Sequence, residues 1–152
     1  MDNIDSKLGS IFSDVLAEII FTVSGFSLEL LSNDKDNDFD EMTGVMSLNG
    51  KKNGILFISV KETDMRRLCS FILGVDDNNV TNEDVEDALC ELVNMTAGSS
   101  KLRLSGSDYV FNLSSPFLLK SQSMNITGKK KTRIISRRIG NEEISLRIKI
   151  VY

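Results

Sequence analysis

The chain has 152 residues, with 18 lysines and arginines against 22 aspartates and glutamates, two cysteines and no histidine. Without histidine it cannot form a Ser-His-Asp or Cys-His nucleophile pair, carry phosphohistidine chemistry or build most zinc and non-haem iron sites. A net charge of −4 also argues against non-specific binding of nucleic acid by the whole domain.

The length and an apolar content of 41% predict one soluble domain over residues 1–152. Cys69 and Cys90 are far apart and lie among apolar residues, so we expect small buried side chains rather than a metal site or a redox pair. The acidic first five residues lack the features of a signal peptide, and no apolar run approaches the roughly 20 residues of a membrane span. These observations predict a cytoplasmic protein that does not contact the membrane.

The N-terminal part of the chain is predicted to be one long helix followed by strands. Apolar residues recur at spacings of three and four over residues 6–25, which is typical of a helix. The segments expected after it are a strand at 26–31, an acidic loop at 32–41, and a hairpin of strands 43–48 and 55–60 that turns at 49–54.

Two further helices precede a strand-rich C-terminal part. The shorter is predicted over residues 62–73, with Thr63 as its N-cap. The longer begins after Thr81, where Asp84 completes a capping box, and it extends to a point between residues 97 and 104. The remaining strands are expected at 109–113, 117–123, 132–138 and 144–151. Three helices and about seven strands, grouped rather than strictly alternating, predict an α+β fold with a mostly antiparallel sheet.

The two long helices are similar to each other in sequence. Residues 14–25 align without gaps on residues 87–98, 73 positions further on, with identical Asp, Leu, Glu and Gly. We interpret the match as an internal repeat, in which two copies of a helix-plus-strands unit form a pseudo-two-fold domain. The alternative is a coincidence between two amphipathic helices.

The third helix displays a small set of polar residues on one side. On a helical wheel, an apolar side collects Val85, Leu89, Leu92 and Thr96. The opposite side collects Asp87, Glu91, Asn94 and Gly98. A carboxylate and an amide are therefore neighbours at i and i+3, and the glycine one turn on would let another backbone approach. The simpler interpretation is an ordinary solvated helix face.

The first helix repeats this display with one change. Its equivalent positions are Asp14, Glu18, Phe21 and Gly25, so that phenylalanine replaces the amide. That face cannot do the same chemistry, and a solvent-facing Phe21 is more typical of an interface or a partly covered surface.

Several motifs, in order, resemble those of one protein family. Residues 91–98 resemble the Glu-x-x-Asn-x-x-x-Gly signature of the CheX/CheC/FliY chemotaxis phosphatases. Residues 54–60 resemble the central strand of CheX-type proteins, and residues 109–116 resemble the strand and proline turn after the signature helix. The resemblance extends over residues 8–152 and favours the compact CheX type.

The resemblance implies dephosphorylation of the phospho-aspartate of a CheY-type response regulator. By motif, Asn94 would orient the attacking water and Glu91 would pair with the regulator's lysine, while Asp87 and Gly98 would contact the partner. Mg²⁺ is expected on the regulator, with no metal or cofactor bound by this chain. Phe21 in place of a second asparagine fits the one-site CheX type, and a homodimer joined through the sheets is implied. The alternative is a non-catalytic module that binds a response regulator or a flagellar switch protein.

Two other charged segments are weaker candidates. Asp34, Asp36 and Asp38 imitate the start of an EF-hand loop, but the glycine and the bidentate acid that calcium requires are absent. The basic residues Lys129–Lys131, Arg133, Arg137 and Arg138 could bind nucleic acid or steer the chain toward an acidic regulator. Because no aromatic residue is interleaved with them, we favour a charged strand edge that resists aggregation.

Overall fold

A computed structural model describes residues 3–33 and 38–152 of the chain. Within this part, α1 (Asn3–Ser24), α2 (Glu62–Leu73) and α3 (Asn82–Arg103) accompany seven strands and one short 3-10 helix, η1 (Asp77–Asn79). The strands are β1 (Glu29–Asn33), β2 (Met42–Gly50), β3 (Gly54–Val60), β4 (Phe111–Asn112), β5 (Phe117–Lys120), β6 (Ile134–Gly140) and β7 (Ser145–Val151). This is the α+β architecture that the sequence predicts.

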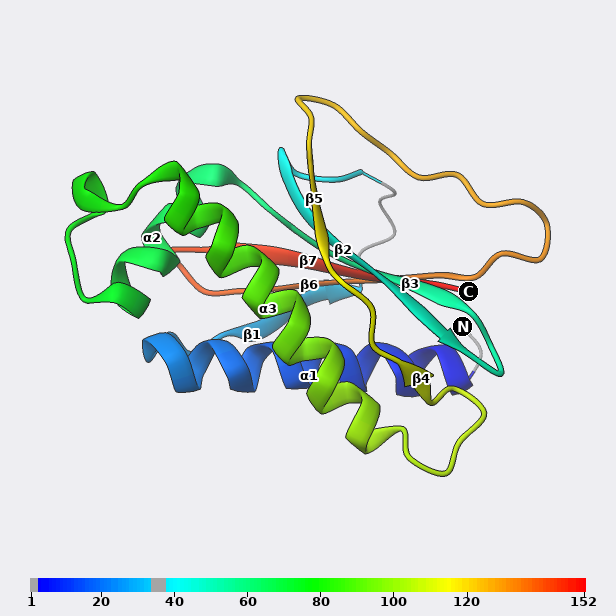
Figure 1. Ribbon diagram of the computed structural model, residues 1–152. Helices are drawn as coiled ribbons and strands as arrows, with labels where there is room; N and C mark the ends of the chain where they lie inside the picture. Colours follow the sequence, from blue (N-terminus) through cyan, green and yellow to red (C-terminus); the bar gives the residue numbers. More distant parts are fainter. Residues whose placement is uncertain (1–2, 34–37) are drawn as a thin grey trace.

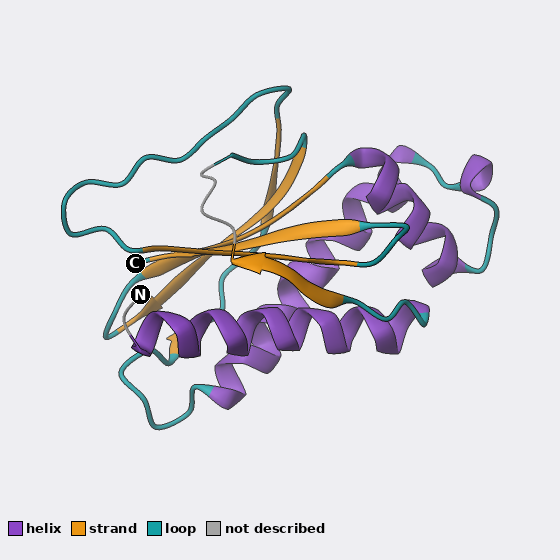
Figure 2. Ribbon diagram, turned by 180° about the vertical axis from the view of Figure 1, so that it is seen from behind, coloured by secondary structure: helices purple, strands orange, loops and turns teal. Residues whose placement is uncertain are grey.

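All the strand pairs are antiparallel, and together they form one sheet in the order β1-β6-β7-β3-β2, with β4 and β5 both paired to the outer side of β2. The helices cover one face of this sheet, and the long connection between β5 and β6 lies on the other side (Figures 1 and 2). The main core is the layer between the helices and the sheet, where side chains such as Phe12, Leu16, Leu56, Leu89 and Ile148 are fully or almost fully buried.

The strand order is what an internal repeat requires. Exchanging β1 with β5, β2 with β6 and β3 with β7 converts the order into its own reverse, with the β3–β7 pair at the centre. The same exchange relates α1 to α3, which pack against each other. The arrangement therefore supports the pseudo-two-fold repeat that the matching helix sequences suggest.

The second face of the sheet carries a smaller, partly polar core. The side chain of Lys149 is completely buried there, with its ammonium 2.7 Å from the Ser136 hydroxyl and 5.4 Å from the centre of the Phe39 ring. Phe39 also packs edge-on against Phe57. The backbone N–H of Phe39 donates to the carbonyl of Met124, so the β1–β2 and β5–β6 connections pair with each other over this face.

Several predicted boundaries are wrong for identifiable reasons. The bounds 62–73 predicted for α2 are confirmed, but its N-cap is Lys61 rather than Thr63, and the Glu41 carboxylate accepts from the Glu62 N–H at 2.6 Å. The first strand begins at Glu29 rather than residue 26, since Phe26 is buried against Phe71 just after the left-handed Gly25 ends α1.

The C-terminal strands also differ in length from the prediction. The segment 109–113 contributes only two strand residues, and 117–123 contributes four. Between them, Ser114 donates its hydroxyl to the carbonyl of Ser47, and Pro116 has no N–H to continue a ladder. The sixth strand is shifted two residues later than expected. In the expected loop at 32–41, Ser32 and Asn33 belong to β1, and Asp38 forms an isolated antiparallel β-bridge with Asn125. Residues 34–37 lie outside the described part.

Candidate active site

The helix α3 is fixed at both ends by local interactions. The Thr81 hydroxyl accepts from the Asp84 N–H at 3.0 Å, and the Asp84 carboxylate accepts from the Thr81 N–H at 2.9 Å. This is the predicted capping box, and it satisfies two donors at the helix start. Acidic residues in the first turn and basic residues in the last turn match the polarity of the helix dipole. A side chain on this helix is therefore held on a rigid support.

One side of α3 packs on α1 and on β2. The predicted apolar face, Val85, Leu89, Leu92 and Thr96, is buried. Gly44 in β2 allows the helix to approach closely, since a Cβ at that position would lie 2.5 Å from Cγ2 of Val93. The distance between helix and sheet, and hence the position of the opposite helix face, depends on this glycine.

The opposite side of α3 presents the predicted polar set. Asp87, Glu91 and Asn94 are exposed and Gly98 is half-buried. A Cβ added at Gly98 would meet no atom within 4 Å beyond its own helical neighbours. No packing requirement among the described residues therefore explains a glycine at this position. The space above it is open to a second molecule.

Glu91 and Asn94 are not used by the fold itself. Within residues 3–33 and 38–152, neither side chain makes a hydrogen bond or an ion pair, and the same holds for Asp87. Because such groups do not stabilise the monomer, their hydrogen-bonding capacity is available to water or to a partner. An exposed carboxylate and an exposed amide at i and i+3 can engage a cation and a water molecule at the same time.

The thiol of Cys90 lies close to these residues but is not a candidate nucleophile. Its side chain is partly buried, and burial raises its pKa, with the carboxylates of Asp87 and Glu86 acting in the same direction. Burial likewise raises the pKa of Cys69. A thiol with a raised pKa is poorly nucleophilic near neutral pH, so both cysteines serve packing.

A small groove flanks the N-terminal half of α3. It has a volume of about 210 Å³ and is lined by Glu41, Met42, Glu62, Asn82, Val85, Glu86 and Lys120. Lys120 of β5 forms an ion pair with Glu86 of α3 across it. None of these residues was a candidate from the sequence, because the pairing of β5 with β2 brings Lys120 to α3 from 34 residues away.

The equivalent face of α1 differs from that of α3 in two ways. Phe21 occupies the place of Asn94 and is 58% exposed. Glu18, which corresponds to Glu91, forms an ion pair with Arg103 near the end of α3. The carboxylate of α1 is thus engaged and the amide is missing, so of these two helices α3 is the one with an unengaged Glu and Asn pair.

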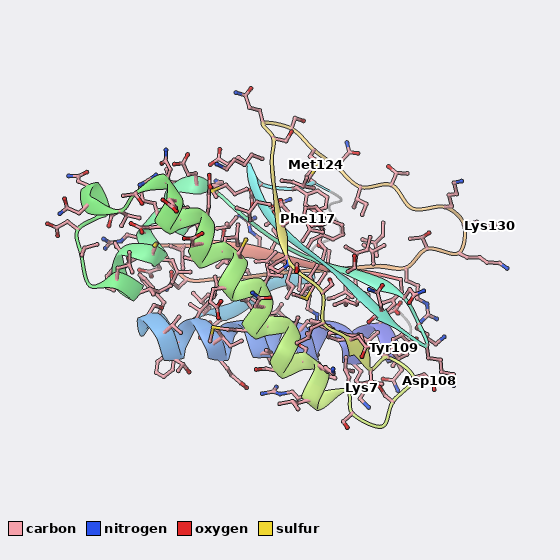
Figure 3. All side chains as sticks on the ribbon, in the orientation of Figure 1. Lys7, Asp108, Tyr109, Phe117, Met124 and Lys130 are labelled. Atoms are coloured by element: carbon pink, nitrogen blue, oxygen red, sulfur yellow. The ribbon has the colours of Figure 1, made fainter. Side chains whose placement is uncertain are left out.

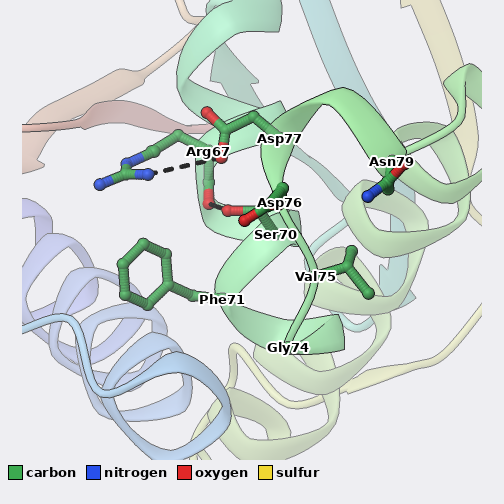
Figure 4. Close-up of a pocket in the computed structure, with 8 residues that line it drawn as sticks. All are labelled: Arg67, Ser70, Phe71, Gly74, Val75, Asp76, Asp77 and Asn79. Atoms are coloured by element: carbon green, nitrogen blue, oxygen red, sulfur yellow. Dashed lines mark hydrogen bonds and ion pairs between the residues drawn. The ribbon is translucent and has the colours of Figure 1, made fainter.

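A larger groove, of about 730 Å³, lies elsewhere, at the end of α2 and at η1 (Figure 4). Arg67 stacks its guanidinium on the Phe71 ring at 4.8 Å and pairs with Asp77 and Glu143. The Ser70 hydroxyl, and then Arg67, hold the pKa of Asp77 below its usual value. These charges are already paired with one another, and no pair of catalytic groups converges here.

Neither a metal-binding cluster nor a membrane-spanning helix occurs among the described residues. Among them, no group of three or more acidic or cysteine side chains is arranged to hold a metal ion. No described helix is both long and apolar enough to span a bilayer. Of the three aspartates that imitate an EF-hand, Asp34 and Asp36 lie outside the described residues.

Comparison with known proteins identifies the family. Residues 42–138 match the family described as chemotaxis phosphatase CheX. No curated protein matches the chain significantly by sequence. Among solved structures, the chemotaxis protein CheX from Vibrio vulnificus superimposes with a TM-score of 0.82 at 21% identity, covering 95% of this chain and 97% of its own.

Two further structures have the same fold. A CheC-like superfamily protein from Shewanella sp. PV-4 gives a TM-score of 0.82 at 24% identity and covers 99% of this chain and 98% of its own. A CheX-CheY-BeF3-Mg²⁺ complex from Borrelia burgdorferi gives 0.75 at 16% identity, covering 93% and 96%. The match over residues 42–138 and this shared architecture lead to one conclusion: the chain belongs to the CheX family of chemotaxis phosphatases.

Proposed function

We propose that the chain hydrolyses the aspartyl phosphate of a CheY-type response regulator, with Asn94 and Glu91 as the residues that act on the substrate. The observation that carries the proposal is the pair itself. Both side chains are exposed neighbours on a rigid, capped helix, and neither has a partner among the described residues. Family membership supports the reaction, and the Borrelia burgdorferi relative is a complex with CheY.

The chemistry required of this chain is positioning rather than covalent catalysis. An acyl phosphate is already reactive, and Mg²⁺ held by the regulator would offset the charge on the phosphoryl oxygens. The Asn94 amide can donate to one group and accept from another, so it can hold a water in line with the phosphorus. The Glu91 carboxylate would pair with the regulator's active-site lysine and so fix the two proteins in register. No histidine and no nucleophile of the chain's own is needed.

Asp87 and Gly98 would frame this contact at the two ends of the polar face. Asp87 lies one turn before Glu91 and adds a second exposed carboxylate. Gly98 leaves open space one turn after Asn94. In this proposal the partner's backbone occupies that space.

The test is phosphate release from a phosphorylated cognate CheY in the presence of Mg²⁺. The native chain should accelerate release, and Asn94→Ala should lower the acceleration on the order of 10²-fold while binding to the regulator persists. Glu91→Ala should weaken binding as well. Glu18→Ala, at the equivalent position of α1, is the matched control and should leave the rate unchanged.

The same experiment distinguishes the alternative function. If the native chain binds the phosphorylated regulator without accelerating phosphate release, it is a docking module and the assignment of Asn94 is refuted. If it neither binds nor accelerates with any regulator of its host, the resemblance describes the fold alone.

We further propose that the protein acts in the cytoplasm as a homodimer joined through its sheets. The exposed edge strand β1 supports the second part, since Leu30 and Leu31 are each about half exposed beside unpaired backbone groups. Sedimentation equilibrium should give twice the 16.9 kDa chain mass. A monomer at all concentrations tested would exclude the dimer without affecting the phosphatase assignment.

A further inference from the structure

Another pocket lies at the end of the sheet where β6 begins and β7 ends. It has a volume of about 240 Å³ and is lined by Lys52, Asn53, Tyr109, Lys131, Arg133 and Tyr152. These residues come from four separate segments: the β2–β3 turn, the loop after α3, the segment before β6 and the end of β7. Three of the six are cationic and none is acidic, in a chain whose net charge is −4.

The fold holds the two tyrosines and Arg133 of this pocket in place. Arg133 and Tyr152 exchange two backbone hydrogen bonds, of 2.8 and 3.0 Å. The Arg133 guanidinium contacts Asp5 at 3.3 Å and the Tyr109 hydroxyl at 3.4 Å. The Tyr152 ring lies over Gly54, where a Cβ would come within 2.6 Å of the ring, and it meets the Tyr109 ring edge-on at 5.2 Å. The aromatic walls are therefore preformed.

The lysines, by contrast, are exposed and movable. Lys52 places its ammonium 5.4 Å from the centre of the Tyr109 ring, where a flexible side chain covers an aromatic face. Lys131 has no ion-pair partner among the described residues. Lys129 and Lys130, which come just before Lys131 in the chain, are exposed as well, and Lys51 is paired with Asp108 at 2.7 Å. Figure 3 places Lys7, Asp108 and Tyr109 toward the same end of the molecule.

The structure also divides the basic cluster of the sequence. Arg137 is buried and donates to the carbonyl of Ser6 under α1, and Arg138 reaches Ser145 within the sheet. Of this basic cluster, Lys131 and Arg133 line the pocket. They are joined there by Lys52 and by two aromatic rings that are distant in sequence. Aromatic rings therefore lie among these basic residues in space, although none is interleaved with them in sequence.

We propose that this pocket binds a small phosphorylated molecule that carries a planar ring, of the nucleoside diphosphate class. Lys131, Lys52 and Arg133 would receive the phosphate oxygens through charge-assisted hydrogen bonds. The ring would stack on the face of Tyr109 as the Lys52 side chain moves from that face to the phosphates. The pocket volume suits the diphosphate, and the ring would lie at the open rim.

Isothermal titration with adenosine diphosphate, pyrophosphate and adenosine, using the whole chain, tests the proposal. Adenosine diphosphate should bind saturably at concentrations below about 1 mM. Pyrophosphate should bind roughly tenfold more weakly, because it lacks the stacking contribution of the ring. Adenosine alone should not bind measurably, since it lacks the charged groups.

Variants locate the binding. Lys131→Gln should weaken both phosphorylated ligands at least about tenfold, and Tyr109→Leu should reduce adenosine diphosphate to the level of pyrophosphate. Lys61→Gln, an exposed lysine at the start of α2, is the matched control and should change nothing. Lys131 is exposed, so its substitution should not disturb folding, and it should leave the dephosphorylation of a regulator unchanged.

Three results would overturn the proposal. One is no saturable binding of adenosine diphosphate up to about 1 mM. Another is equal weakening by Lys61→Gln and Lys131→Gln, which would mean general charge attraction. The third is binding of a single-stranded oligonucleotide, steeply salt-dependent, with none of the small ligands, which would identify a nucleic-acid surface instead.

Discussion

Replacing Gly98 with alanine should raise the stability of α3 and weaken the binding of a partner to its exposed face, so the two effects can be measured separately. Gly98 lies inside the helix, outside the left-handed region, and an added Cβ would meet nothing within 4 Å beyond its helical neighbours. The substitution should therefore cause no strain. A glycine inside a helix is less favourable than alanine by about 0.8–1 kcal/mol, so Gly98→Ala should stabilise the monomer by that amount. For a chain of this length the melting temperature should rise by about 2–4 °C.

The same methyl group should interfere with the proposed partner. If a regulator backbone packs against Gly98, the added methyl group overfills the contact at a cost of about 1–3 kcal/mol, or roughly 5- to 150-fold in Kd. Ser99→Ala, on the neighbouring exposed position, should stabilise the helix without this loss. Thermal unfolding and titration with a phosphorylated regulator measure the two effects. A destabilised Gly98→Ala would refute the packing argument, and a stabilised variant with unchanged affinity would place the regulator elsewhere.

Two further substitutions test other parts of the structure. Gly44→Ala would place a Cβ 2.5 Å from Val93, so it should lower the free energy of unfolding in urea by about 1–3 kcal/mol. In the double variant, Val93→Ala should recover part of that loss. Additive effects of the two substitutions would contradict the close contact. Burial, and then Tyr109, raise the pKa of Tyr152 to about 12, so the folded state holds its proton more tightly than the unfolded chain does. That contribution is fully present below pH 10 and is lost as the pH rises toward 12. Between pH 9 and pH 11 stability should fall by about 1 kcal/mol more in the native chain than in Tyr152→Phe. With only two tyrosines and no tryptophan, absorbance at 295 nm reports the ionisation directly, and an unshifted titration would refute the prediction.

The sequence alone predicted the elements whose signals are local. The capping box of Thr81 and Asp84, the division of α3 into a buried and a polar face, and the hairpin of β2 and β3 follow from neighbouring residues, and the structure confirms them. The α+β fold was predicted from the grouping of helices and strands, and the family from short motifs in order, and both are confirmed. The candidate residues Glu91 and Asn94 belong to this local class, since a single helix places them together. Their catalytic role stays a prediction until phosphate release is measured.

Only the tertiary structure decided features that depend on residues far apart in the chain. The first N–H of α2, that of Glu62, donates to the distant Glu41 rather than to a neighbouring side chain. Lys149 is buried on the second face of the sheet, where the β1–β2 and β5–β6 connections pair with each other, and the sequence does not predict that pairing. The tyrosines of the cationic pocket reach Lys131 and Arg133 through strand pairing. Periodicity reports which way a side chain points within its own helix or strand, but not which distant segment it meets. That choice depends on how the sheet and helices pack, so the contacts between segments were decided by the fold as a whole.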